Sequence, residues 1–408
     1  MSKRPEWLEE KGLQQLFAAS KAAGGEARVV GGAVRDWLMG IDPSSLYKLC
    51  RTSGGDVDVA STLLPAQTME LAAQQGWKAI PTGIDHGTVT LVLPERIVEV
   101  TTLRRDVETD GRHATVSFTD DWKEDAARRD FTMNALYMDA DGTITDYFDG
   151  QKNLKAHLVR FIGDAATRIA EDGLRMLRYF RFLASHGKPP ADEAALAAIA
   201  AKKEMVVALS GERIANEMRK LLSVENPAYA LRLMKQTGIA PLVFGREIEP
   251  QSVIRLHMLE VQADHQISVW ARALLLLPDS GAADATWLSE RWKLSRHETG
   301  QLQVLVKLPK FDSSAPKHMH TRLLRLHHAP VYLDWLLVQA ALTPGIDIAA
   351  YAALAMDFVA PVFPVTAKDL MAKGMSEGKA LGEALAQLEK RWEESDYTLS
   401  KDVLLNRN

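Results

Sequence analysis

Gly54-Gly55-Asp56-Val57-Asp58-Val59 is the stretch that decides the fold of the N-terminal part of this 408-residue chain. Side chains along a strand alternate between its faces, so Asp56 and Asp58 project from one face while Val57 and Val59 enter a core. Two neighbouring carboxylates repel each other, and holding them together normally requires a cation such as Mg²⁺, which prefers hard oxygen ligands. A solvated strand face is the plainer alternative. The surrounding motifs favour a metal site that activates an attacking hydroxyl and steadies a leaving group.

The motif Val30-Gly31-Gly32-Ala33-Val34-Arg35-Asp36 lies upstream, between a predicted strand over 27–30 and a predicted helix over 33–38. Glycines let the backbone approach a ligand closely, and the N–H groups at a helix start attract phosphate. A Gly-Gly pair alone is more often only a tight turn. Beside the paired carboxylates, Gly31 and Gly32 become candidates for a phosphate-binding turn.

The remaining pattern predicts an α+β fold. Strands are expected over 56–60, 77–80, 88–93, 97–103, 135–139 and 143–147, with a helix over 65–75. After about Asp164 only helical periodicity continues, so a mixed β-sheet domain over 1–160 should precede all-α regions over 161–222, 223–343 and 344–408. Glu99 faces outward from its predicted strand, where it either supports the metal site or is a plain exposed residue.

Composition indicates a soluble globular protein, with 47% hydrophobic and 25% charged residues. No apolar run approaches the length of a membrane span, and no apolar stretch follows Lys3 and Arg4, so neither a membrane partner nor export is expected. The single cysteine, Cys50, suits a reducing cytoplasm. The net charge of −4 argues against a protein that coats nucleic acid indiscriminately, but it leaves room for a nucleic-acid enzyme with local arginine clusters.

The segment Ala127-Arg128-Arg129-Asp130-Phe131-Thr132-Met133-Asn134-Ala135 contains two adjacent arginines near an acid and an amide. Arginine forks match phosphate oxygens, so the pair suggests a phosphate or ribose clamp. Asp130 and Asn134 are expected to orient Arg128 and Arg129. In isolation, the same residues would be read as a surface salt bridge.

The stretch from Glu171 to Arg181 predicts one amphipathic helix, on which Asp172, Arg175 and Arg178 share the polar side. An aspartate accepts from the exocyclic amino group of cytosine or adenine, and an arginine donates to the adjacent ring nitrogen. Uracil and guanine present the reversed pattern, so one Asp–Arg pair selects C and A without a template. Glu171 is placed to hold Arg175 in plane. The same spacing also fits an ordinary helical ion pair, and the geometry puts Arg181 beside the apolar stripe.

Together these motifs resemble those of bacterial class II tRNA nucleotidyltransferases, within the tRNA nucleotidyltransferase/poly(A) polymerase family. The matching motifs appear in the family's order: Gly31–Asp36, Asp56–Asp58, Leu103–Asp106, Arg129–Ala135, Glu171–Arg178, and Gly211–Ile214 with Glu217. The stretch 106–128 resembles the family's flexible loop.

The resemblance implies template-independent addition of CCA to the 3′ end of tRNA from CTP and ATP. It implies a nucleotidyltransferase head (1–160), a base-reading neck (161–222), and a body (223–343) and tail (344–408) that bind tRNA. The implied metal ligands are Asp56 and Asp58, and the metal is Mg²⁺. The implied nucleotide-binding residues are Gly31, Gly32, Arg35, Arg129, Asp172, Arg175, Arg178 and Arg181. No protein partner is evident.

Two departures from the family pattern stand out. Ser44–Ser53 is an apparent insertion, and the histidines after the neck lack the companion spacing of a His-Asp metal motif. A poly(A) polymerase is the nearest alternative, although the segment 81–89 resembles the CCA-adding branch. Enzymes that add only CC or only A, and an inactive RNA-binding relative, are further alternatives.

Overall fold

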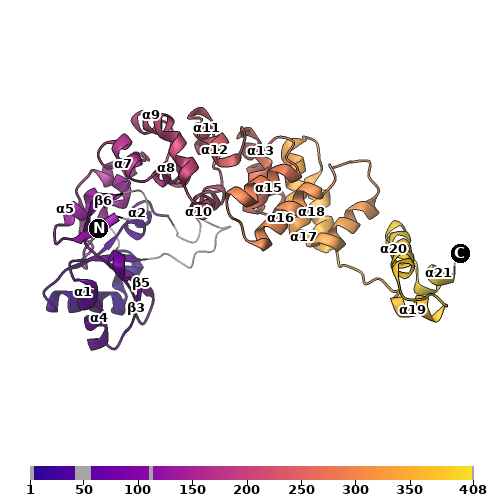
Figure 1. Cartoon of the computed structure of the whole chain (residues 1–408), viewed down its shortest axis with the longest axis horizontal. Coiled ribbons are helices and arrows are strands. Elements are labelled where there is room, and N and C mark those ends of the chain that lie inside the picture. The colour runs from indigo at the N-terminus through magenta and orange to yellow at the C-terminus, as the bar shows by residue number, and fades with distance from the viewer. Residues whose placement is uncertain (1–3, 42–56, 110–113, 407–408) are drawn as a thin grey trace. The chain divides into compact units, whose positions relative to one another are not determined.

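The computed structural model describes residues 4–41, 57–109 and 114–406 (Figure 1). The chain divides into two compact units. The first comprises Met1–Pro250 and Trp287–Ser295, and the second comprises Gln251–Thr286 and Arg296–Asn408. Asp56 and the apparent insertion Ser44–Ser53 lie outside the described residues. Within the described ranges, no helix is long and apolar enough to cross a membrane.

A seven-stranded mixed sheet forms the centre of the head, as the sequence predicts. The strand order is β3-β4-β5-β2-β1-β8-β9, with β2 and β5 parallel and the other neighbours antiparallel. Its strands are β1 (Ala27–Val30), β2 (Asp58–Ser61), β3 (Lys78–Gly83), β4 (Thr88–Val92), β5 (Ile97–Thr102), β8 (Leu136–Met138) and β9 (Ile144–Asp146).

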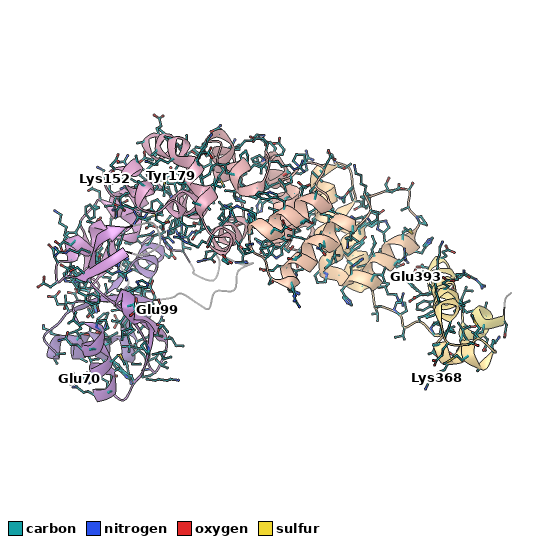
Figure 2. All side chains as sticks on the ribbon, viewed as in Figure 1. Glu70, Glu99, Lys152, Tyr179, Lys368 and Glu393 are labelled. Atoms are coloured by element: carbon teal, nitrogen blue, oxygen red, sulfur yellow. The ribbon has the colours of Figure 1, made fainter. Side chains whose placement is uncertain are left out.

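Strand register determines which side chains share a face of this sheet. Asp58 on β2 pairs with Glu99 on β5 and with Val30 on β1, so these three side chains lie on one face. The neighbouring residues Val59 and Val100 point the other way and are buried. The predicted alternation of acidic and apolar residues is therefore confirmed for Asp58. Figure 2 labels Glu99 in the head.

Short helices surround the sheet. The helix α1 contacts β1, and α4 contacts β3, β4 and β5. The start of α4 follows from its sequence, because Pro65 occupies the first turn and Gln67 accepts a hydrogen bond from the Leu64 N–H at 2.9 Å. The helical elements here are η1 (Glu6–Glu9), α1 (Lys11–Ala22), α2 (Gly32–Leu38), α4 (Pro65–Gln74), η2 (Ile84–His86), η3 (Thr132–Asn134) and α6 (Gly150–Lys155).

The stretch compared above with a flexible loop contains regular structure. The strands β6 (Arg104–Thr109) and β7 (Ala114–Phe118) form a two-stranded sheet, and α5 (Trp122–Ala127) follows. Asp121 caps α5 by accepting from the Lys123 N–H at 2.7 Å. The tip of the hairpin, 110–113, lies outside the described residues.

Helices alone follow β9 in the described part of the chain. Those of the first unit are α7 (Ala165–Glu171), α8 (Leu174–His186), α9 (Glu193–Lys202), η4 (Lys203–Ala208), α10 (Gly211–Leu222), α11 (Ala228–Gln236) and α12 (Ala240–Phe244). The single helix expected from Glu171 to Arg181 is wrong. Asp172 has an extended conformation (φ −154°, ψ 108°) and separates α7 from α8. The break is stabilised because the Asp172 carboxylate accepts from the Leu174 N–H at 3.0 Å and so caps α8.

The second unit is also helical and has two buried clusters. One includes Leu256, Leu336 and Leu337, and the other, near the C-terminus, includes Leu381 and Trp392. Figure 2 labels Glu393 in this last part. Its helices are α13 (Gln251–Ala263), α14 (Val269–Leu275), α16 (Arg296–Lys307), α17 (Lys317–Leu342), α18 (Ile348–Asp357), α19 (Ala367–Ala372), α20 (Lys379–Glu394) and α21 (Lys401–Asn406), while α15 (Ala282–Arg291) spans the unit boundary. The expected division at 222/223 and 343/344 stays a prediction.

Candidate functional site

A cavity of about 490 Å³ in the first unit collects most of the candidate residues. They come from the β1–α2 turn, β2, the start of β6, the segment after α5, and the α7–α8 region. The lining residues are Gly31, Gly32, Arg35, Asp58, Arg104, Arg128, Arg129, Asp130, Asn134, Asp172, Arg175, Arg178 and Phe182. Arginines outnumber aspartates two to one in this lining, so the cavity suits a polyanionic ligand.

The β1–α2 turn presents bare backbone to the cavity. Gly31 has φ +75°, which L side chains rarely adopt, and its N–H donates to the Leu136 carbonyl at 3.1 Å. A Cβ on Gly32 would meet only the tip of Arg35, at 3.7 Å. The fold therefore requires glycine at position 31 for its backbone conformation, whereas Gly32 leaves space on the cavity side. This agrees with the close ligand approach expected for the pair.

Asp58 brings a carboxylate to the cavity from the centre of the sheet. Its side chain is exposed, and its register partner Glu99 on β5 is exposed as well. Glu99 does not appear among the described lining residues. Asp56, the second expected ligand, is outside the described ranges, and the described part contains no cluster of three acidic, histidine or cysteine side chains able to hold a metal. Carboxylate oxygens such as that of Asp58 are nevertheless the donors that a hard divalent cation prefers.

Arg35 is fixed by two partners on its buried side. Its Nη1 donates to Asn134 Oδ1 at 2.8 Å and its Nε to Asp36 Oδ1 at 2.6 Å, and the residue is 6% exposed. Asn134 in turn donates to Asp130 Oδ1 at 3.0 Å. The expectation that Asp130 and Asn134 orient the adjacent arginine pair is therefore wrong, because they orient Arg35 and a neck arginine.

That neck arginine is Arg178, whose Nε donates to Asp130 Oδ2 at 2.6 Å. Burial raises the pKa of Asp130, but the Arg178 charge, together with hydrogen bonds from Asn134, Arg178 and the Phe131 N–H, lowers it to about 2. Asp130 is therefore ionised at neutral pH and links the head to α8.

The adjacent pair Arg128 and Arg129 is held by Asp125 on α5. Arg128 Nε donates to Asp125 Oδ1 at 2.8 Å, and Arg129 Nη2 donates to Oδ2 at 3.1 Å. The Tyr137 hydroxyl donates to the same Oδ2 at 2.8 Å. Burial raises the pKa of Asp125, but the two arginine charges and these hydrogen bonds lower it to about 2.

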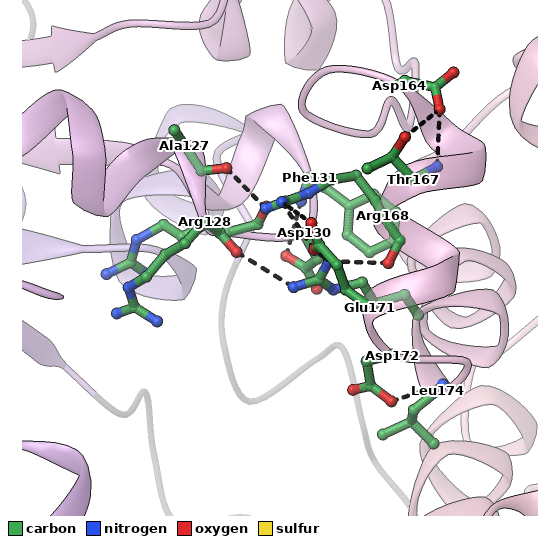
Figure 3. A network of polar contacts seen from close by, with 12 residues as sticks. Ala127, Arg128, Asp130, Phe131, Asp164, Thr167, Arg168, Glu171, Asp172 and Leu174 are labelled. Carbon is green, nitrogen blue, oxygen red and sulfur yellow. Dashed lines mark hydrogen bonds and ion pairs between the residues drawn. The ribbon is translucent and has the colours of Figure 1, made fainter. Parts of the chain in front are cut away.

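Neck arginines bind backbone carbonyls of the same head segment (Figure 3). Arg168 donates to the carbonyls of Ala127 (2.7 Å) and Arg129 (2.9 Å), and Arg175 donates to that of Arg128 (3.3 Å). Arg175 also forms the expected ion pair with Glu171. The arginine proposed to read the base is thus tied to the segment that carries the arginine pair.

Asp172 lines the cavity from the break between α7 and α8. Its Oδ2 accepts from Arg213 Nη2 on α10 at 2.7 Å, while Oδ1 caps α8. The structure therefore brings Asp172, Arg175 and Arg178 to one cavity, although not through a continuous helix.

Arg181 occupies a different environment. It is 6% exposed, its Nε lies 2.8 Å from Glu217 Oε2, and its guanidinium lies over the Phe182 ring at 3.9 Å. Arg181 is absent from the described cavity lining. This placement agrees with the helical geometry, which puts Arg181 beside the apolar stripe.

Behind Arg35, a buried histidine contacts the head from the end of α8. His186 Nε2 lies 3.0 Å from Asp36 Oδ1, and His186 Nδ1 lies 2.6 Å from Ser185 Oγ. Burial and the Arg35 charge lower the pKa of His186 to about 4, against the hydrogen bond to Asp36. The imidazole is therefore neutral at pH 7, and its Nε2–H donates to the ionised Asp36.

Several site residues were not identified from sequence. Phe182, in the cavity lining, looks like one more apolar residue of α8. The spacing of Asp125 to Arg128 and Arg129, three and four residues along a helix, is a signal that could have identified the carboxylate holding the pair. Nothing local marks Arg213 as the partner of Asp172, 41 positions away.

Comparisons with known proteins identify the family of this chain. Residues 27–160 match the Poly A polymerase head domain, and residues 192–251 match the probable RNA and SrmB-binding site of polymerase A. The CCA-adding enzyme of Lacticaseibacillus paracasei is 33% identical over 380 residues, covering 91% of this chain and 89% of the relative. The crystal structure of the Bacillus stearothermophilus CCA-adding enzyme in complex with CTP is similar, with a TM-score of 0.76 and 27% identity, covering 95% of this chain and 93% of that one.

The mitochondrial CCA tRNA nucleotidyltransferase 1 of Mus musculus is 36% identical over 407 residues, covering 97% of this chain and 88% of the relative. Similarity of this extent includes the head, the neck and the helices that follow. The chain therefore belongs to the tRNA nucleotidyltransferase/poly(A) polymerase family.

Proposed function

We propose that this protein adds CCA to the 3′ end of tRNA from CTP and ATP and releases pyrophosphate. The observation that carries the proposal is the single cavity that joins Asp58, a cluster of arginines, and the pair Asp172 and Arg175. A nucleotide bound there would meet both the Asp58 carboxylate, for metal chemistry, and the Asp172–Arg175 pair, for base selection. The names of the similar enzymes support the same reaction.

Enzymes of this family generally use divalent metal ions, and the proposal here is Mg²⁺ held by Asp56 and Asp58. The exposed Asp58 carboxylate at the cavity wall fits such an ion. When bound, the metal supplies charge for the triphosphate and for the attacking hydroxyl. The terminal tRNA hydroxyl attacks the α-phosphorus in line, and pyrophosphate leaves.

The side chains described above bind and orient the nucleotide in this proposal. Arg35 and Arg129 bind the triphosphate or ribose, and the open backbone at Gly31 and Gly32 lets a phosphate approach. Arg178 faces the same cavity and adds positive charge. The gain in rate is mainly positional and electrostatic, because the arginines are fixed before substrate arrives.

Base selection is assigned to Asp172 and Arg175. The carboxylate accepts from the amino group of C or A, and the guanidinium donates to the adjacent ring nitrogen. For Arg181 the proposed contribution is indirect. Its ion pair with Glu217, which also lies 3.8 Å from Arg178 Nη1, supports α8 behind the cavity.

The helical regions 223–343 and 344–408 are proposed to bind the tRNA by shape and backbone charge. A cytoplasmic location is proposed from the single cysteine, although the similar mouse enzyme is named as mitochondrial.

Incorporation into a tRNA that lacks its CCA end tests the proposal, with Mg²⁺ and each labelled nucleotide supplied separately and then together. We expect two CMP, then one AMP, then a stop. A long AMP tail would indicate a poly(A) polymerase, and addition of only CC or only A would indicate a partial enzyme. No transfer at all would indicate an RNA-binding relative.

A further inference from the structure

The carboxylate of Asp125 contacts two cavity arginines, Arg128 and Arg129, from outside the cavity lining. It is 1% exposed, in the last turn of α5, and it does not line the cavity. Six N–H or O–H groups converge on its two oxygens. This number exceeds what a simple surface ion pair requires, and it suggests that the carboxylate fixes several groups at once.

Each carboxylate oxygen of Asp125 contacts a different arginine, Oδ1 contacting Arg128 and Oδ2 contacting Arg129. Oδ1 accepts from Arg128 Nε at 2.8 Å and from the Arg104 N–H at 3.3 Å, and Arg128 Nη2 lies 2.8 Å from it as an ion pair. Oδ2 accepts from Arg129 Nε (3.3 Å) and Nη2 (3.1 Å) and from the Tyr137 hydroxyl (2.8 Å). Each guanidinium therefore has its own oxygen, and both arginines still reach the cavity.

Tyr137 completes the arrangement on the Oδ2 side. Its hydroxyl accepts from Arg129 Nε at 3.2 Å while it donates to Asp125. Its ring is fully buried and packs edge-on against Trp122 at 5.3 Å. The hydroxyl position is thus set by the core of the head, and Arg129 is held at Nε by two groups that cannot move independently.

We propose that Asp125 is a positioning residue that holds Arg128 and Arg129 in the orientation needed to bind the triphosphate of the incoming nucleotide. This inference rests on the proposed nucleotidyltransferase function and deepens it. Two adjacent guanidinium groups repel each other, and without the shared carboxylate they would separate. With it, both forks are oriented before the ligand binds, which reduces the entropy lost on binding.

Asp125→Asn is the direct test, because it keeps the shape of the side chain. The asparagine amide keeps one acceptor oxygen, but its NH₂ group replaces the other oxygen and faces the N–H donors of one arginine. That arginine, Arg128 or Arg129, therefore loses its hydrogen-bond acceptor. We expect the dissociation constant for CTP, measured without tRNA, to rise about tenfold or more, the order that hydrogen bonds to charged groups contribute. The KM for CTP and ATP should rise similarly, while the KM for tRNA stays within about twofold.

Binding of the nucleoside cytidine separates positioning from a merely structural role. Cytidine has no phosphates, so Asp125→Asn should weaken CTP binding and leave the inhibition constant of cytidine unchanged. A general loosening of the cavity would weaken both equally and would overturn the proposal. Tighter CTP binding would also overturn it, because the carboxylate would then act chiefly as an opposing charge.

Two further variants keep the test decisive. Glu124→Gln makes the same change in charge one residue earlier on α5, where the side chain bonds Thr119 Oγ1 at 2.7 Å, and it should leave CTP binding unchanged. Tyr137→Phe removes one donor from Oδ2 without removing the charge and should raise the CTP dissociation constant by a smaller factor, about threefold. If Asp125→Asn does not fold, unchanged CTP binding in Tyr137→Phe refutes the proposal. A wild-type protein that transfers neither CMP nor AMP would instead refute the proposed function.

Discussion

Replacing His186 with Gln should remove an acid-sensitive component of stability. The imidazole is buried between α8 and the head, where it donates to Asp36 and lies near the charge of Arg35. Because its pKa falls from 6.5 to about 4 on folding, the unfolded chain binds a proton between these two values and the folded protein does not. The free energy of unfolding should therefore decrease as the pH falls through this window.

The magnitude follows from the two pKa values. Between pH 7.5 and pH 4.5, the linkage amounts to about 2.5 kcal/mol. No discount for solvent screening applies, because the side chain of His186 is 1% exposed. Asp36 has a lowered pKa, so its own acid sensitivity has the same sign but belongs to a lower pH range.

Urea-induced unfolding at both pH values, followed by circular dichroism in the wild type and in His186→Gln, measures this quantity. Glutamine can still donate to Asp36 but does not titrate, so the other groups largely cancel in the difference between the proteins. The wild type should lose about 2.5 kcal/mol more than the variant. Parallel losses would show that His186 is not held neutral in the folded protein, and the reasoning about its burial would be wrong.

Three other changes test the site. Asp58→Asn should lower the single-turnover rate of nucleotide transfer at least about a thousandfold, with little change in urea unfolding. In the wild type, EDTA should cause the same loss of activity until Mg²⁺ is restored. Substantial residual activity in Asp58→Asn would refute the assignment of Asp58 as a metal ligand. Asp172→Ala should relax discrimination against UTP in competition assays and also cost about 1 kcal/mol of stability through the lost cap of α8. If UTP is still rejected, the base-reading assignment is wrong. Glu217→Gln should cost about 3 kcal/mol in urea unfolding, because it removes the carboxylate that faces the buried charge of Arg181. A loss below about 1 kcal/mol would mean that this ion pair contributes little to stability.

The sheet could be predicted because its signals are local. Alternation around Asp58 and the β-branched runs at 88–93 and 97–103 need only the neighbouring residues, and the strands of the structure follow them closely. The break at Asp172 was missed for an equally local reason. The polar positions Arg175 and Arg178 continue the helical periodicity of the preceding turn, which favours one continuous helix. An Asp-Gly pair before an apolar run is equally typical of the start of a new helix. The pattern alone does not decide between one helix and two.

The partners of the site residues could not be predicted, because they are distant in sequence. His186 and Asp36 are 150 positions apart, and Arg178 and Asp130 are 48 apart. Such pairs depend on how the neck packs against the head, which no short motif encodes. The sequence pointed to Arg35, Arg129, Arg175 and Arg178, which line the cavity, but also to Arg181, which does not, and it misassigned the acid that orients Arg128.

Because the helix is interrupted at Asp172, the two residues proposed to select the base, Asp172 and Arg175, are held by different parts of the structure. Arg175 belongs to α8 and donates a hydrogen bond to the carbonyl of Arg128, so it is linked to the segment that carries the arginines proposed to bind the phosphates. Asp172 sits in the gap and is bonded to Arg213 of another helix. Asp172 and Arg175 are therefore positioned by different elements, so substitutions at Arg213 should affect base selection while the contact of Arg175 with the segment that carries Arg128 and Arg129 stays in place.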